Sequence, residues 1–551
     1  MKILKEYRIN DVLRLKLEKG RWDSEGYEID YGKETHRIQI YVKDIPFRTC
    51  KYLLIINPQD DDRFEEIESI DDAKRLLNSD LETKITPQEL NITPEEEFWA
   101  HCSNLQAWAE NDYETRLLHS NLAFPLLRKL MKVGVAKARE RYSEEVLERY
   151  AKGTPQIKYM LLQWDYFDYI PFEKQISIIE DQDEYDFIVL LNHLYYGEFQ
   201  LGDFRVDNGL IDTLTLKKHP KLKEIPTEIN NLTHLKKLVI DLPNIIHVPN
   251  SIGTLKCLKE LRITAPNLLT LPESIGKLKS LKSLYISNAN ITALPESIGS
   301  LVDLEEIILE KCERFEMVPE SIGKLKKLIT LSINDTNLKE LPNSVGRLDS
   351  LESLRINDSS LEKLPDSIGN LQCSVTIDNG MLESLPKSIG NMKTSWIQIT
   401  RNKLKELPES FGNIKRLERL NLGNNCLNKL PESIGKLKEL ESLQVYGNQL
   451  ESIPESIRNL RNLESLFLGR NNLKEFPMAI LELENLRRLS IGRNQITSIP
   501  DEIYKLKKLE DLYLRKLSIT KLSPYLRYKG EKEKPYLYEL KVDKFHEVIP
   551  F

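Results

Sequence analysis

The sequence predicts an α/β fold in which a long, curved solenoid, with a parallel β-sheet on its concave face, follows a smaller N-terminal domain that is mainly α-helical and contains some strands. Three observations predict it. A leucine recurs every 23 residues, as at Leu420, Leu443 and Leu466, and a proline recurs at the same period. Apolar and polar residues alternate around these leucines. At 551 residues the chain is too long for one compact core, whereas a repeat array grows without thickening.

The leucine and proline columns each mark one structural position in successive units. Half of the chain's 26 prolines fall in a single column, which excludes coincidence. The leucine column consists of Leu238, Leu261, Leu284, Ile307, Leu331, Leu354, Leu420, Leu443, Leu466, Leu489 and Leu512. The proline column consists of Pro226, Pro249, Pro272, Pro295, Pro319, Pro342, Pro365, Pro386, Pro408, Pro431, Pro454, Pro477 and Pro500.

Each unit reads approximately LxxLxLxxNxLxxLPxSIGxL, as in LERLNLGNNCLNKLPESIGKL. The alternation places Leu420 and Leu422 on one side of a short strand and Asn421 on the other, so stacked units form a parallel sheet with one solvated face. The following proline cannot donate a ladder hydrogen bond, so the chain turns there onto the convex side. A short helical turn is expected over 432–434, with Gly435 ending it in the left-handed conformation. Strands about 4.8 Å apart on one side and wider turns on the other make the array curve.

This unit resembles the leucine-rich repeat family, over roughly Leu210 to Leu522. The LPESIG segment is most similar to the intracellular Ras-group-related repeats of plants and the Ras-associated scaffold repeats of animals. The resemblance implies a right-handed horseshoe whose concave face binds proteins. The run FWAHCSNLQAWAENDYETRLLHSNLAFPLL also resembles a segment that precedes such repeats in uncharacterised archaeal proteins, and that likeness implies no activity.

Asparagine at the loop position differs between the two halves of the array. An amide there can bond the backbones of neighbouring units, and Asn402, Asn425, Asn448, Asn471 and Asn494 form an unbroken series. Earlier units lack it, the CERFEMVP stretch adds one residue, and LQCSVTIDNGML is two short. We therefore expect a regular C-terminal half joined to a less uniform N-terminal half.

Four regions are expected along the chain. Residues 1–90 form a small β-rich or α+β segment, 91–202 an α-helical, HEAT-like region, 203–522 about 13 or 14 repeats, and 523–551 a C-terminal cap. In the first region RIQIYV and KYLLIIN read as strands separated by a turn at Lys43-Asp44, and a short helix is expected near 69–77. Thr93-Pro94-Glu95-Glu96 combines an N-cap, a proline and a capping-box glutamate, so a helix starts there. Two further helices are expected in LLHSNLAFPLLRKLM and SEEVLERYAKG, and another after Thr154-Pro155.

Composition excludes several functions. A net charge of −6 with no long basic block disfavours nucleic acid as a partner. No run of about 18 apolar residues predicts a membrane span, and MKILKEYRIN has no apolar block of a secretory signal, so a cytoplasmic location is expected. Six cysteines stand singly, which favours reduced, mostly buried thiols. No cofactor or metal site is predicted, and the Asp60-Asp61-Asp62 cluster lacks the pattern of a calcium loop.

Catalysis has one candidate centre, where His101, Cys102 and His119 lie close together in the sequence. A cysteine beside a histidine can be an activated nucleophile. Adjacent residues on a helix point about 100° apart, so His101 cannot pair directly with Cys102. A buried, inert cysteine is the better interpretation, and we expect no enzyme activity.

The candidate binding residues lie at the C-terminal end of the concave face, where strand side chains have no packing role. Exposed aromatic residues beside arginines are typical of interface hot spots, whereas the middle of the array is acidic, for example at Glu310, Asp358 and Asp378. The predicted protein-binding residues are Trp396, Arg401, Arg419, Tyr446, Phe467, Arg470, Arg488, Arg493, Tyr513 and Arg515.

The sequence therefore favours a monomeric adaptor or scaffold whose C-terminal concave patch binds an acidic, partly apolar protein surface, with the acidic middle fixing orientation. The resemblance to Ras-associated repeats implies a role in intracellular signalling, with small GTPases as candidate partners. An alternative is an enzyme whose N-terminal domain acts on proteins recruited by the repeats. A secreted adhesion protein is a third reading, disfavoured by the absence of cysteine-stabilised caps.

Overall fold

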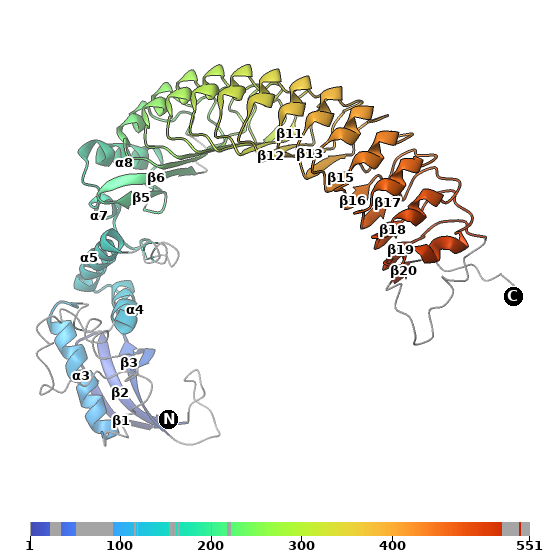
Figure 1. Ribbon diagram of the computed structural model, residues 1–551. Coiled ribbons are helices and arrows are strands. Elements are labelled where there is room, and N and C mark those ends of the chain that lie inside the picture. The colour runs from blue at the N-terminus through green and yellow to red at the C-terminus, as the bar shows by residue number, and fades with distance from the viewer. Residues whose placement is uncertain are drawn as a thin grey trace, which may run out of the picture. The chain divides into compact units, whose positions relative to one another are not determined.

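The computed structural model divides the chain into two compact units, Met1–Ile178 and Ile179–Phe551 (Figure 1). The first unit contains an antiparallel sheet and helices, and the second contains the repeats. The structure describes residues 2–21, 35–50, 92–114, 117, 120–153, 158, 161, 166–199, 201–217, 222–520 and 539–541.

The first unit opens with a four-stranded antiparallel sheet in the order β1-β2-β3-β4. The turn predicted at Lys43-Asp44 is confirmed, with φ of 47° and 63°, and RIQIYV lies in the strand before it. The strand after the turn is formed by Ile45–Cys50, whereas KYLLIIN lies outside the described residues. The strands are β1 (Lys2–Arg8), β2 (Leu13–Gly20), β3 (Thr35–Val42) and β4 (Ile45–Cys50).

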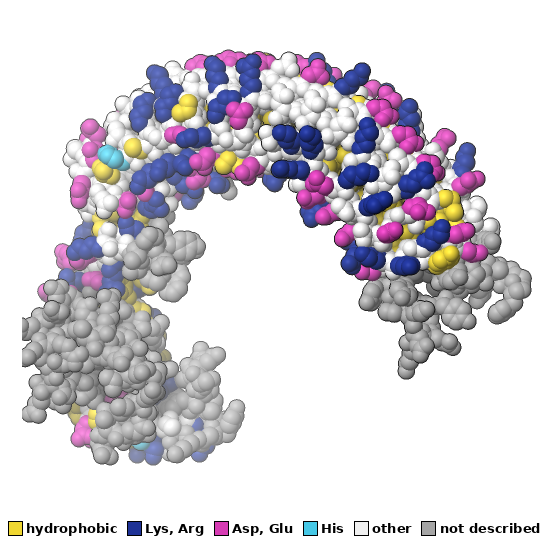
Figure 2. Space-filling view, viewed as in Figure 1, with side chains coloured by type: hydrophobic (Ala, Val, Ile, Leu, Met, Phe, Trp, Pro, Cys, Tyr) yellow, Lys and Arg dark blue, Asp and Glu magenta, His cyan; other side chains and the backbone are white. Residues whose placement is uncertain are grey.

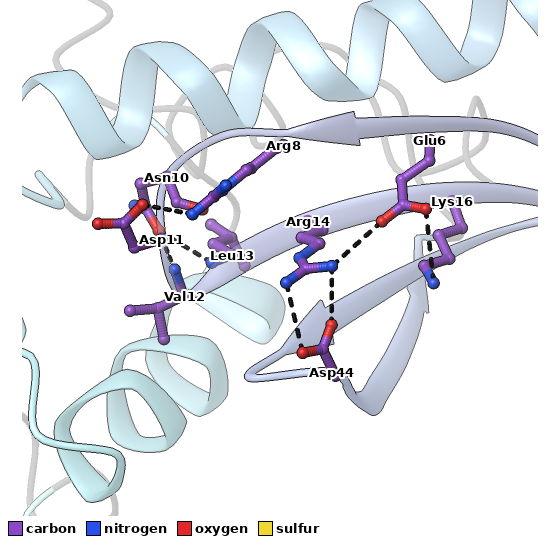
Figure 3. A network of polar contacts seen from close by, with 9 residues as sticks. All are labelled: Glu6, Arg8, Asn10, Asp11, Val12, Leu13, Arg14, Lys16 and Asp44. Atoms are coloured by element: carbon purple, nitrogen blue, oxygen red, sulfur yellow. Dashed lines mark hydrogen bonds and ion pairs between the residues drawn. The ribbon is translucent and has the colours of Figure 1, made fainter.

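The connection from β1 to β2 is held by side chains (Figure 3). The Asn10 side-chain oxygen accepts hydrogen bonds from the backbone N–H groups of Val12 at 2.9 Å and Leu13 at 2.8 Å. Arg14 on β2 lies between the carboxylates of Glu6 on β1, at 3.4 Å, and Asp44, at 2.9 Å. These contacts fix the turn and connect the ends of three strands.

The first described helix begins where the sequence predicts, whereas α5 begins at Ala136, ahead of the SEEVLERYAKG segment in which it was expected. Thr93 caps α3, because its hydroxyl accepts from the Glu96 N–H and the Glu96 carboxylate accepts from the Thr93 N–H. The helix expected near 69–77, the Asp60-Asp61-Asp62 cluster and the helix start at Thr154 lie outside the described residues. The helices are α3 (Pro94–Glu110), α4 (Ser120–Lys132), α5 (Ala136–Lys152) and α7 (Phe172–Ile176). A HEAT-like arrangement stays a prediction.

The second unit is built on a sixteen-stranded sheet whose strands follow sequence order. The first two are antiparallel and the rest pair in parallel, as predicted for stacked units. The sheet lines the inner side of the arc (Figure 1). Its strands are β5 (Phe204–Asp207), β6 (Leu210–Lys217), β7 (Lys237–Asp241), β8 (Glu260–Thr264), β9 (Ser283–Ser287), β10 (Glu306–Cys312), β11 (Thr330–Thr336), β12 (Ser353–Asn357), β13 (Ser374–Asp378), β14 (Trp396–Thr400), β15 (Arg419–Asn421), β16 (Ser442–Gln444), β17 (Ser465–Phe467), β18 (Arg488–Ser490), β19 (Asp511–Tyr513) and β20 (Glu539–Lys541).

The two halves of the array differ as expected, and the difference appears in strand length. Strands β7 to β14 have five or seven residues, whereas β15 to β19 all have three. The asparagine series links neighbouring units in this half. The Asn448 amide donates to the carbonyls of Leu422 at 3.0 Å and Val445 at 3.1 Å, and its oxygen accepts from the Leu427 N–H at 3.0 Å. The amide thus connects two units in addition to the backbone bonds between them, such as the one from the Leu422 N–H to the Gln444 carbonyl.

On the convex side each unit makes a 3-10 turn directly after its proline (Figure 1). The expectation that Gly435 takes a left-handed conformation is wrong, because its φ is not positive. Glycine is needed there for space, since a Cβ on Gly435 would lie 2.3 Å from the Ser456 carbonyl oxygen of the next turn. The turns are η3 (Thr227–Asn231), η4 (Asn250–Thr254), η5 (Glu273–Lys277), η6 (Glu296–Ser300), η7 (Glu320–Lys324), η8 (Asn343–Arg347), η9 (Asp366–Asn370), η10 (Lys387–Asn391), η11 (Glu409–Asn413), η12 (Glu432–Lys436), η13 (Glu455–Asn459), η14 (Met478–Glu482) and η15 (Asp501–Lys505).

The N-terminal end of the array is covered by helix α8 (Gln182–Leu194), which contacts η3. The second unit therefore starts at Ile179, ahead of the repeats expected from residue 203. Glu184 of α8 is buried, and its carboxylate accepts a hydrogen bond from the Ile211 N–H of β6 at 2.6 Å. At the other end β20 pairs with β19, so residues from the expected cap extend the sheet.

Candidate protein-binding surface

The solvent-facing side of the C-terminal strands is organised in four columns, defined by sheet register and backbone hydrogen bonds. The first column is Trp396, Arg419, Ser442, Ser465, Arg488 and Asp511, and the second is Gln398, Asn421, Gln444, Phe467, Ser490 and Tyr513. The third column is Thr400, Gly423, Tyr446, Gly469, Gly492 and Arg515. The fourth column is Arg401, Asn424, Gly447, Arg470 and Arg493. The fourth column is defined by backbone hydrogen bonds, since the N–H group of each member donates to the third-column carbonyl of the next unit.

The structure places all ten predicted residues on this side of the sheet, opposite the buried leucines. Trp396 is 39% exposed at the start of β14, and the Arg419 guanidinium of the next strand lies 5.8 Å from the centre of its ring. Phe467 and Tyr513 lie two strands apart in the second column and are partly exposed. Figure 2 shows Lys and Arg side chains together with exposed apolar ones near the C-terminal end of the array.

Three of the six members of the third column are glycines. Gly423 leaves room for the ring of Tyr446, because a Cβ on Gly423 would lie 2.5 Å from that ring. Gly469 and Gly492 follow Tyr446 in the same column. All three glycines are buried, so the solvent-facing members of this column beside Phe467 are Tyr446, which is partly exposed, and Arg515, which is exposed.

The fourth column contains a feature that the sequence did not reveal. Its residues adopt the left-handed conformation, with φ of 51° at Arg401, 58° at Arg470 and 54° at Arg493. Gly447 and Asn424 are ordinary occupants of such a position, whereas a long side chain costs about 1 kcal/mol there. The same conformation occurs in earlier units, for example at Lys311 and Asp335, so it is a property of the repeat turn. The three arginines stand where local backbone energy favours glycine or asparagine.

Arg401 differs from the other two, because its charge is neutralised within the array. Its guanidinium binds both carboxylate oxygens of Asp378, with one bond of 2.8 Å, and the Thr400 hydroxyl donates to the same carboxylate at 2.6 Å. The bonds from Arg401 hold the pKa of Asp378 below its ordinary value. Asp378 is the third-column residue of the preceding unit, so the pair links two neighbouring units.

The acidic residues in the middle of the array are largely occupied by neighbouring units. Glu310 accepts from the Tyr285 hydroxyl at 2.7 Å, Glu305 pairs with Lys282 at 2.7 Å, and Glu306 accepts from Ser283 at 2.8 Å. These pairs connect adjacent strands, so they stabilise the stacking of units. The predicted role of this region in orienting a partner stays a prediction.

The candidate catalytic pair is buried. His101 and Cys102 lie on α3 with 3% and 2% exposure, and burial raises the pKa of the Cys102 thiol to about 12. A thiol with that pKa is protonated at neutral pH and is a poor nucleophile. His119 lies outside the described residues. Within the described ranges, no cluster of three or more His, Cys, Asp or Glu side chains is arranged to hold a metal.

Thiol labelling tests this assignment within one molecule. Cys257 is exposed and Cys102 is buried. A maleimide probe should therefore modify Cys257 in the folded protein and reach Cys102 only after denaturation, as measured by peptide mass spectrometry. Fast labelling of Cys102 in the folded protein would instead favour the enzyme alternative.

No described helix combines the length and apolarity needed to cross a bilayer.

The open concave sheet and its convex 3-10 turns define a repeat protein with one exposed, variable strand face. Models of two repeat families match the array: the leucine-rich repeat region over 210–314 and 309–378, and the leucine rich repeat over 393–450, 439–496 and 461–519. Together they match more than half of the 551 residues. The chain belongs to the leucine-rich-repeat proteins.

Solved structures of the same fold come from several sources. A leucine-rich-repeat protein of Leptospira interrogans is 31% identical over 56% of this chain and 85% of its own, with a TM-score of 0.48. The plant peptide hormone receptor RGFR1, in complex with RGF2, is 30% identical over 54% and 50%, with a TM-score of 0.45. An internalin of Listeria monocytogenes is 21% identical over 61% and 96%, with a TM-score of 0.45. No curated protein matches the sequence.

Proposed function

We propose that this protein is a non-enzymatic adaptor that binds another protein on the C-terminal concave patch. The patch consists of the residues predicted from the sequence other than Arg401, whose guanidinium is already bound by Asp378. Phe467, Arg470 and Arg493 lie at its centre. The observation that supports it most is a set of exposed arginines beside partly exposed aromatic rings. Arginine and aromatic residues dominate the binding energy of protein interfaces.

The charge on the patch favours an acidic partner. Among the described residues, no ion pair or hydrogen bond engages the guanidinium groups of Arg470, Arg488, Arg493 and Arg515. Unpaired like charges that lie close together repel one another, and an acidic surface relieves this repulsion. The aromatic rings of Trp396, Tyr446 and Phe467 supply the apolar area that an interface needs. A cytoplasmic role in signalling, with small GTPases as partners, is the finer form of the proposal and rests on the LPESIG resemblance.

The test is a triple variant, Phe467→Ala with Arg470→Gln and Arg493→Gln. Affinity purification from extracts of the producing cells should recover a partner with the unmodified protein and lose it with the variant. The melting temperature should change little, because all three side chains lie outside the leucine core.

A matched control removes one apolar and two basic side chains from the convex side: Met478→Ala, Lys505→Gln and Lys507→Gln, all exposed. This control should keep the partner. Recovery of the same partner by the concave triple variant would disprove the assignment of the patch.

A further inference from the structure

The Arg401–Asp378 pair shows how the array itself neutralises an arginine in the fourth column. The carboxylate comes from the third column of the preceding unit. The same third-column position holds Tyr446 before Arg470, and Gly469 before Arg493. The backbone geometry is the same in all three cases, because the N–H groups of these arginines donate to the carbonyls of Gly423, Gly492 and Arg515 at 3.1, 2.9 and 2.8 Å.

The two downstream arginines therefore have the geometry of Arg401 without its carboxylate. Both are exposed, both have positive φ, and neither guanidinium is engaged by a described residue. They occupy adjacent units, which lie about 5 Å apart in a parallel sheet. The third-column residues that precede them, Tyr446 and Gly469, supply no carboxylate.

We propose that Arg470 and Arg493 form a two-carboxylate receptor, in which Asp or Glu side chains of the protein partner take the place that Asp378 takes beside Arg401. This inference rests on the proposed function and specifies the partner chemistry: an acidic segment presenting two neighbouring carboxylates. The internal pair supports carboxylate as the ligand, because a planar guanidinium binds a carboxylate through two parallel bonds.

A variant of the free protein tests the receptor without a partner. Gly469→Asp places a carboxylate one unit before Arg493, as Asp378 precedes Arg401. A Cβ at Gly469 would lie 3.1 Å from the Gly492 carbonyl oxygen, so the substitution has a steric cost, which Gly469→Asn shares without the charge. The aspartate variant should melt at a higher temperature than the asparagine variant at neutral pH. The difference should vanish in an Arg493→Gln background and in acid.

A second experiment measures the binding of a fluorescein-labelled peptide rich in glutamate and leucine by fluorescence polarisation. Arg470→Gln or Arg493→Gln should weaken binding about tenfold or more, since each removes charge-assisted bonds. Gly469→Asp should weaken it as well, because the internal carboxylate occupies Arg493, whereas Gly469→Asn should bind like the unmodified protein. Arg401→Gln is the matched arginine control and should leave binding unchanged, because Asp378 already occupies that guanidinium.

Three outcomes would contradict the proposal that Arg470 and Arg493 form a two-carboxylate receptor. Equal melting temperatures for the two Gly469 variants would show that Arg493 does not face this position. Equal loss of peptide binding in the Arg401 variant would show general attraction to polyanions. Binding of a phosphoserine peptide or inorganic phosphate with no binding of the glutamate peptide would assign the arginines to phosphate.

The proposed function fails separately. If the concave triple variant retains the native partner while the glutamate peptide still requires Arg470 and Arg493, the receptor exists but the patch is not where that partner binds. If Phe467→Ala alone loses the partner while both Gly469 variants retain it, the patch is correct and the receptor is wrong.

Discussion

Gly435→Ala should lower the free energy of unfolding by about 3 kcal/mol, although alanine is a mild change at most positions. The added Cβ would lie 2.3 Å from the Ser456 carbonyl oxygen and 2.7 Å from the Ser456 Cβ. The nearest atom belongs to the backbone, so it cannot rotate away, and turns η12 and η13 must separate. In a solenoid that separation weakens one interface between neighbouring units, on which the stability of the whole array depends. Urea unfolding followed by circular dichroism measures the change.

The array contains its own control for this prediction. The equivalent position of the next unit is Arg458, so a side chain is tolerated there, and the residue that corresponds to Ser456 is Ala479. Arg458→Ala should change the free energy of unfolding by no more than about 0.5 kcal/mol. If Gly435→Ala were equally mild, the close approach of the turns would not require glycine.

The period of the sequence predicted the sheet and its core, because one structural position repeats many times. Leu420 and Leu443 are buried and adjacent in register, and Asn448 bonds two neighbouring units as its position indicated. Gly435 was misjudged for a physical reason. Glycine allows both positive φ and close backbone approach, and a single sequence does not distinguish the two.

The sequence predicted which residues form the candidate surface, but not which of them form ion pairs with neighbouring units. Alternation along each strand identifies which side chains face solvent, so the column containing Phe467 follows from the repeat alone. The left-handed backbone at Arg470 was not predictable, because arginine is not a signal for that conformation. The neutralisation of Arg401 by Asp378 also depends on which unit lies beside which, and the shortened units in that region hide the alignment.

The unmodified protein should become less stable as the pH rises from mildly acidic to neutral, and Glu184→Gln should abolish this decrease. Burial raises the pKa of the Glu184 carboxyl to about 7, the Ile211 N–H opposes this shift, and the nearby Asp181 adds to it. A carboxyl group with a raised pKa stabilises the fold fully below its unfolded pKa, near 4.5, and this contribution is lost as pH rises through 7. The difference between the two pKa values corresponds to about 3 kcal/mol.

Glutamine has nearly the same shape, stays neutral, and can still accept the bond from Ile211. The variant and the unmodified protein should therefore be similar in stability at pH 4, whereas the variant should be more stable at pH 8. Hydrogen exchange of the Ile211 amide against pH reports on this site directly, and urea unfolding reports on the array. A matched control is Asp183→Asn, an exposed carboxylate on the same helix, which should leave the pH profile unchanged. If the stability of the Glu184 variant and that of the unmodified protein depended on pH in the same way, the Glu184 carboxyl would be exposed to water through opening of α8. This helix would then not cover the first repeat stably.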